Sequence, residues 1–126
     1  MSIKISGKIS LPDDSPASFP PNSQFKVKFE DVSIADAPSV RLGQTLVDLS
    51  SYRKGYPIEY TIECPRPTNC GPFFSVSAVL TVGWTPAPNS QEWVRLGDYL
   101  TDTMFSVEIQ PGKTEYKRDF HLIHYQ

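Results

Sequence analysis

Apolar and polar residues alternate along most of the chain, and the alternation is clearest over residues 73–84. One parity of this stretch carries Phe74, Val76, Ala78, Leu80, Val82 and Trp84. The other parity is mostly small or hydroxylated, as at Ser75, Ser77 and Thr81. Successive side chains of a β-strand point to opposite faces, so one face of this segment is apolar. Residues 73–84 are therefore predicted to form a long central strand whose apolar face is covered by a second sheet.

The same alternation predicts seven further strands, at residues 3–11, 25–30, 39–48, 58–64, 92–98, 103–110 and 114–125. The third is interrupted at Gly43, and Gly7 in the first marks a bulge or a close approach of another segment. Many of the 12 prolines lie between these runs, as expected for strands joined by rigid loops. We predict an all-β protein, a single antiparallel β-sandwich of about seven to eight strands in one domain, residues 1–126.

Composition narrows the classes of function. The 12 basic and 14 acidic residues give a net charge of −2, whereas a nucleic-acid-binding domain would favour a basic patch. No apolar run approaches the roughly 20 residues of a membrane-spanning helix. Residues 1–7 are predicted to form a strand rather than an export signal, and no cysteine near them could accept a lipid. An envelope or secreted location is expected if a signal precedes Met1, and a cytoplasmic one otherwise.

Cys64 and Cys70 are the only cysteines, and they bracket a short loop between two predicted strands. Two interpretations stand at this stage, a small disulfide ring or a pair of free thiols. A zinc site is not expected, because structural zinc normally takes four ligands and no histidine is close in the sequence.

Residues 31–38, Asp-Val-Ser-Ile-Ala-Asp-Ala-Pro, are predicted to turn the chain after the second strand. Asp31, Ser33 and Asp36 can bond to nearby backbone N–H groups, and Pro38 favours extended geometry before it. The alternative is that Asp31 and Asp36 supply oxygen ligands to a cation such as Ca²⁺. We prefer the structural turn and predict no metal site.

Trp84, Trp93 and Tyr99 are the candidate recognition residues, because Trp84 and Trp93 flank one predicted turn. Exposed tryptophan and tyrosine at strand ends can anchor a partner protein or stack on a sugar ring. With Phe105 they could equally form hairpin packing at one end of the core.

No catalytic motif is present. The sequence contains no Gly-x-Ser-x-Gly elbow, and His121 and His124 are three residues apart in a predicted strand, so they are expected on opposite faces. We therefore expect neither an enzyme nor a cofactor.

Four segments in this order resemble a known family: residues 5–9, residues 25–38 with their Asp-Val-Ser-Ile-Ala-Asp-Ala-Pro element, residues 57–60, and residues 98–107. Over roughly residues 3–109 the chain resembles the YbaY-like lipoprotein domain, which is related to the type III secretion pilotin or lipoprotein chaperone. The resemblance implies a β-sandwich with a non-enzymatic envelope role, in which pilotin-type members assist an outer-membrane secretin.

The expected function is therefore a protein-binding or assembly-assisting module. Its partner would add an extended segment to an exposed strand edge, and pairing of two copies through such an edge would give a homodimer. The alternative function is a soluble secreted or cytosolic recognition sandwich, for which carbohydrate is one candidate ligand.

Overall fold

The computed structural model describes residues 2–32, 40–67, 73–87, 91–103 and 105–126. The strands are β1 (Ser2–Ser10), β2 (Gln24–Asp31), β3 (Val40–Val47), β4 (Ile58–Pro65), β5 (Phe74–Thr81), β6 (Tyr99–Leu100), β7 (Phe105–Val107), β8 (Glu115–Lys117), β9 (Phe120–His121) and β10 (Ile123–His124). One 3₁₀ turn, Leu49–Ser51, follows β3. The all-β prediction is thus confirmed, with no α-helix in the part of the chain described.

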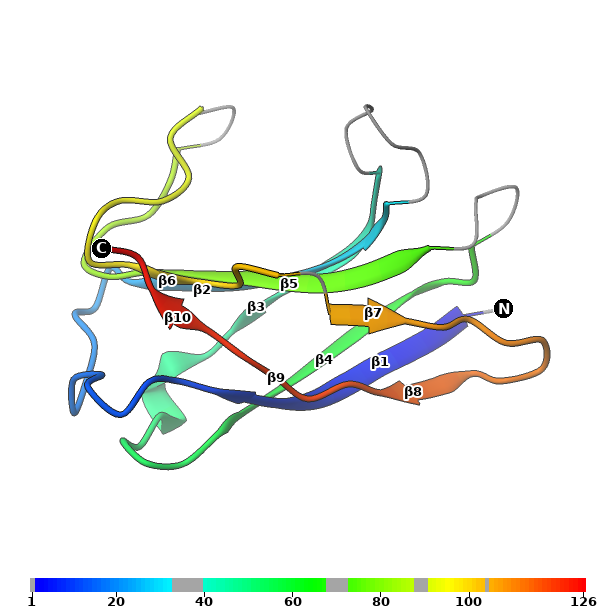
Figure 1. Ribbon diagram of the computed structural model, residues 1–126, viewed down its shortest axis with the longest axis horizontal. Helices are drawn as coiled ribbons and strands as arrows, with labels where there is room; N and C mark the ends of the chain where they lie inside the picture. Colours follow the sequence, from blue (N-terminus) through cyan, green and yellow to red (C-terminus); the bar gives the residue numbers. More distant parts are fainter. Residues whose placement is uncertain (1, 33–39, 68–72, 88–90, 104) are drawn as a thin grey trace.

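Two sheets face each other as the layers of a sandwich (Figure 1). In the first, which we call sheet A, β1 lies between β4 on one side and β8 and β9 on the other. In the second, sheet B, the order is β10-β6-β5-β2-β3, and β7 also pairs with β5. The predicted central strand, β5, is therefore the middle strand of sheet B. Its alternate residues from Phe74 to Leu80 are buried, as the alternation predicted.

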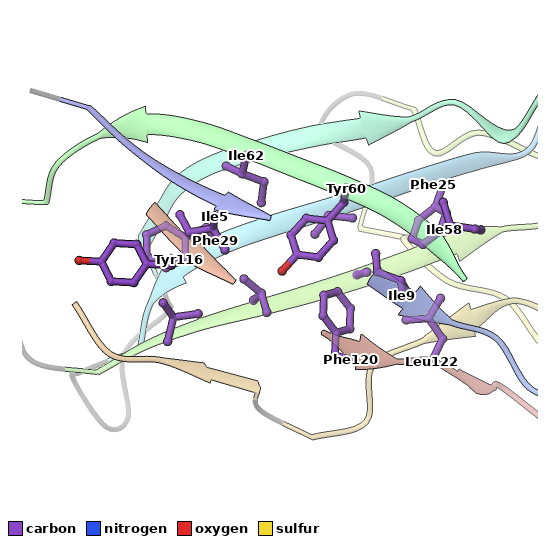
Figure 2. Close-up of a cluster of buried hydrophobic side chains, with 14 of the residues drawn as sticks. Ile5, Ile9, Phe25, Phe29, Ile58, Tyr60, Ile62, Tyr116, Phe120 and Leu122 are labelled. Carbon is purple, nitrogen blue, oxygen red and sulfur yellow. The ribbon is translucent and has the colours of Figure 1, made fainter. Parts of the chain in front are cut away.

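The core is filled by side chains from the inner faces of both sheets (Figure 2). Phe29 of β2 stacks on Phe74 of β5 with ring centroids 5.7 Å apart. Tyr60 of β4 meets Phe120 of β9 edge to face at 5.4 Å. Ring pairs of this geometry add to the hydrophobic free energy gained by burying the rings.

The last predicted strand, residues 114–125, is broken into three short strands. Residues of β8 and β9 pair with β1 in parallel, and β10 then pairs with β6 of sheet B. The C-terminal segment thus passes from one layer to the other (Figure 1). Tyr116, Phe120 and Leu122 are buried, so the predicted inward parity is confirmed although the strand is discontinuous.

Gly7 explains where the last strand breaks. A Cβ atom at Gly7 would lie 2.2 Å from the carbonyl oxygen of Arg118, so the last segment approaches β1 at this point more closely than a residue other than glycine would allow. The predicted close approach is confirmed. The β1–β4 register has no shift, and the bulge lies instead between Phe29 and Glu30, where β2 pairs with β3.

Tyr60 is expected to make the folding stability of the protein fall as the pH rises in the alkaline range. Burial, and then the charge of Asp119, raise the pKa of the Tyr60 phenol well above its usual range, and its hydroxyl donates to the carbonyl of Arg118 at 2.6 Å. In the unfolded chain the phenol loses its proton at about pH 10. The stability that the buried, protonated phenol contributes is therefore complete below that pH and is lost progressively above it.

We therefore expect the free energy of unfolding, measured with urea from pH 8 to 11.5, to fall above about pH 10. Tyr60→Phe should show a smaller fall than the wild type. The control Tyr56→Phe changes a side chain that is 69% exposed and should follow the wild-type curve. An unchanged slope in Tyr60→Phe would contradict this prediction.

Candidate functional site

The edges of the two sheets meet where β3 and β4 lie side by side. Each strand is the last of its sheet, so among the described strands neither has a hydrogen-bonded neighbour on its outer side. Gly43 of β3 permits close packing, since a Cβ there would lie 2.9 Å from the Cγ2 of Ile62 and 3.0 Å from the Cβ of Cys64. The sandwich is therefore closed at Gly43 by contact between its two edges.

Beyond Gly43, towards the end of β3 and the start of β4, a groove opens. Its volume is about 710 Å³, within the range of about 300–1,000 Å³ usual for ligand sites. The lining residues come from the two edges, the connection between them, and β1: Lys8, Thr45, Leu46, Val47, Asp48, Tyr56, Pro57, Ile58, Glu59, Tyr60 and Thr61. We call this feature the edge groove.

The edge groove combines apolar and charged groups. Leu46 is 59% and Tyr56 69% exposed, so two large side chains with apolar surface face solvent beside the strand edges. Lys8, Asp48 and Glu59 add charges of both signs. The Asp48 carboxylate accepts a hydrogen bond from the backbone N–H of Ser50 at 2.9 Å, and this bond holds the pKa of Asp48 below its usual value.

Unpaired strand edges give the groove a binding chemistry. An edge strand presents a row of backbone N–H and C=O groups that an added strand can use. In the edge groove two such edges lie together, with exposed apolar side chains beside them. This arrangement suits an extended peptide segment, whose backbone would pair with β3 or β4 and whose side chains would contact Leu46 and Tyr56.

The three predicted recognition aromatics do not form one surface. Tyr99 is buried, at 3% exposed, and stacks on His124 at 4.7 Å. Trp84 is half-buried, and the guanidinium of Arg95 lies over its ring at 3.9 Å. Only Trp93, at 54% exposed, presents a large free aromatic surface.

The strand predicted at residues 92–98 is wrong, because this segment is a loop with a turn at its end. The buried Asp98 carboxylate accepts three bonds, from the backbone N–H groups of Val82 and Arg95, both at 2.8 Å, and from Nε1 of Trp84 at 2.9 Å. Side-chain acceptors that bond nearby backbone favour turns over strands. Arg95 is held further by a bidentate contact with Glu92.

Several of the predicted residues lie at the end of a described segment or outside the described residues. Asp31 ends β2, whereas Ser33, Asp36 and Pro38 lie outside the described residues. Cys64 is buried in β4 and forms no disulfide with another described residue, and burial raises the pKa of its thiol. Cys70 lies outside the described residues, so the disulfide stays a prediction.

The described residues contain no cluster of three or more His, Cys, Asp or Glu side chains placed to hold a metal ion. His121 contacts the ring of Phe105, while a ring nitrogen of His124 lies 3.2 Å from the carbonyl of Gly97. The same described residues also include no helix that is long and apolar enough to cross a membrane.

The residues of the edge groove were not identified from the sequence. The prediction that a strand edge would be the binding surface needed the strand order, which alternation does not encode. Leu46 carried a local signal. It lies on the outward parity of β3, opposite Lys26, where a polar residue would be expected.

Comparison with known proteins supports the fold. No protein-family model matches the chain, and no curated protein sequence matches it. A solved structure does match, described as an alternative pilotin from the type II secretion system of Vibrio cholerae. The two share 20% sequence identity with a TM-score of 0.67, over 100% of this chain and 99% of that one. The chain is therefore similar in fold, along its whole length, to a pilotin.

Proposed function

We propose that this chain is a non-enzymatic, assembly-assisting module that binds a protein partner in the edge groove. The observation that carries the proposal is the likeness to a pilotin over both complete chains, together with a groove bordered by two unpaired strand edges. The matched pilotin belongs to a type II secretion system, so the partner we propose is a component of a bacterial secretion apparatus.

Affinity would come from two sources. Backbone hydrogen bonds to the edge of β3 would supply a sequence-independent part, and contacts with Leu46 and Tyr56 would supply selectivity. Lipoprotein character and a closer relation to YbaY-like or type III proteins belong to the same proposal, and they rest on the sequence resemblance alone.

Carbohydrate binding is less well supported. A sugar platform needs accessible aromatic faces, and of the three candidate rings Tyr99 is buried and Trp84 has Arg95 over one face. We therefore do not propose it.

The test is calorimetric titration of the chain with the purified outer-membrane secretin of the source organism. We expect Tyr56→Glu combined with Leu46→Glu to weaken binding at least about tenfold, which is 1.4 kcal/mol, because both changes place charge in an apolar contact. The matched control is Leu96→Glu, which alters a leucine that is 75% exposed in the Arg95–Asp98 turn.

Hydrogen exchange gives a second measurement. Addition of a strand to β3 should slow exchange of the backbone amides of residues 44–47. Equal binding by the groove variant and the wild type, or protection confined to strands other than β3 and β4, would refute the edge groove. Dimerisation of the chain alone with the same protection would show that a second copy occupies it.

A further inference from the structure

A row of apolar side chains crosses the outer face of sheet B. The strand registers place five residues opposite one another in sequence across β3, β2, β5, β6 and β10: Leu46, Lys26, Val79, Leu100 and Ile123. Directly opposed residues share a face of the sheet. Four of the five are aliphatic, and we call this set the outer row.

The outer row faces solvent. Leu46 is 59% exposed, and the other four residues are partly exposed, whereas the neighbouring residues Val27 and Leu80 point into the core. Sheet B forms one layer of the sandwich, and its outer side faces away from β1 and β4 (Figure 1). The flanking rows are polar, with Gln24 opposite Thr81 on one side and Lys28 opposite Gln44 and Ser77 on the other. An aliphatic row among polar rows is characteristic of a contact surface.

The charges beside the row are positive and unpaired. Neither Lys26 nor Lys28 takes part in an ion pair within the described part of the chain. Glu30, the nearest carboxylate on β2, lies opposite Arg41 and accepts a hydrogen bond from Ser77. Asp102 is exposed beyond Leu100, outside the row. The middle of the row therefore complements a partner with apolar and acidic groups.

The spacing of the row selects the form of the partner. Neighbouring strands lie about 4.8 Å apart, so the side chains of the row repeat at that distance. One stripe of an α-helix repeats every three to four residues, or about 5.3 Å. One face of an extended strand repeats about every 6.7 Å, which loses register over five positions. A helix of about 13 residues spans the roughly 19 Å of the row.

We infer that the outer row is a second docking surface, which binds an amphipathic helix with an apolar stripe flanked by carboxylates. The stripe packs on Val79, Leu100 and Ile123, and the carboxylates contact Lys26 and Lys28. The row shares Leu46 with the edge groove, and its other four residues, Lys26, Val79, Leu100 and Ile123, lie outside the groove and distinguish the two surfaces.

The test uses a synthetic helical peptide of about 14 residues, with leucines every three or four positions and glutamates beside them. Its binding is measured by fluorescence anisotropy. We expect Lys26→Glu with Lys28→Glu to weaken binding at least about tenfold, and added salt to weaken wild-type binding. The matched control, Lys54→Glu with Lys113→Glu, makes the same change in net charge on exposed residues elsewhere.

A second variant, Leu100→Ser, should weaken binding without changing net charge, and thermal unfolding confirms that each variant is folded. A scrambled peptide of the same composition, and one with lysine in place of glutamate, should not bind. No binding by the wild type, equal binding of the scrambled peptide, or full affinity in the Lys26/Lys28 variant would overturn the inference. Loss of peptide binding in Tyr56→Glu alone would place the peptide in the edge groove, and this would also overturn it.

Discussion

Replacing Asp98 by alanine is expected to lower the free energy of unfolding by about 3 to 4 kcal/mol. The Asp98 side chain is buried, and its two oxygens accept three hydrogen bonds from Val82, Trp84 and Arg95. Alanine leaves all three donors without this acceptor, and leaving a buried donor unsatisfied costs about 1–3 kcal/mol when water cannot reach it. Some donors will regain water, so the total is less than the full sum.

Urea unfolding at neutral pH measures the effect. Asp98→Asn keeps one acceptor oxygen but brings an NH₂ group towards donors, so it should lose about half as much stability. The control is Asp102→Ala, which changes an exposed aspartate four residues away and should stay within about 0.5 kcal/mol of the wild type. An Asp98→Ala protein as stable as that control would show that the carboxylate does not hold this loop.

The alternation of apolar and polar residues predicted most of the sandwich, because the residue types within a single strand are enough to show which of its faces is buried. In β1, β2, β4 and β5 the apolar parity is the buried parity. Two-residue periodicity is sufficient there, since each of these strands is long and covered on one side. Sandwich architecture follows, because two amphipathic sheets bury their apolar faces against each other.

The alternation gave a wrong prediction where a single polar group or a distant segment determines the backbone conformation. Trp93, Val94 and Leu96 suggested a strand at residues 92–98, but the Asp98 carboxylate holds the end of the segment as a turn. Local patterning cannot show that the donors from Val82 and Trp84 lie close to Asp98. The failure is of the kind expected for short apolar runs, in which tertiary contacts override the pattern.

Both candidate surfaces depend on the same missing information, the order of strands. The edge groove exists because β3 and β4 are the last strands of different sheets, and the outer row exists because five strands align Leu46, Val79, Leu100 and Ile123. A sequence shows which face each residue takes but not which strands are neighbours. The predicted anchors were chosen from residue type and from their place near predicted strand ends, neither of which shows whether a ring is exposed, and Tyr99 proved to be buried.

Gly7→Ala is expected to destabilise the protein by more than about 3 kcal/mol, or to prevent folding. A methyl group at Gly7 would lie 2.2 Å from the carbonyl oxygen of Arg118, a backbone atom that cannot rotate away. That oxygen also accepts the hydroxyl of Tyr60, which lies opposite Gly7 in β4. Moving the carbonyl would break this bond and also displace the neighbouring N–H of Arg118, which donates to Ser6 at 2.8 Å.

The matched control is Gly43→Ala, the same substitution at a second tight glycine. Its methyl would meet the Cγ2 of Ile62 at 2.9 Å, which can move by rotation of that side chain, and the Cβ of Cys64 at 3.0 Å, which moves only with the backbone of β4. Both contacts are much longer than the one at Gly7, so we expect a loss of about 1–2 kcal/mol. Urea unfolding compares the two variants, and hydrogen exchange at the Arg118 amide reports on the close approach itself. Faster exchange there in Gly7→Ala but not in Gly43→Ala is expected, because Arg118 lies against Gly7 between the residues of β8 and β9 that pair with β1. Equal stability of the two variants would mean that the close approach tolerates a side chain and that something else breaks the strand between β8 and β9.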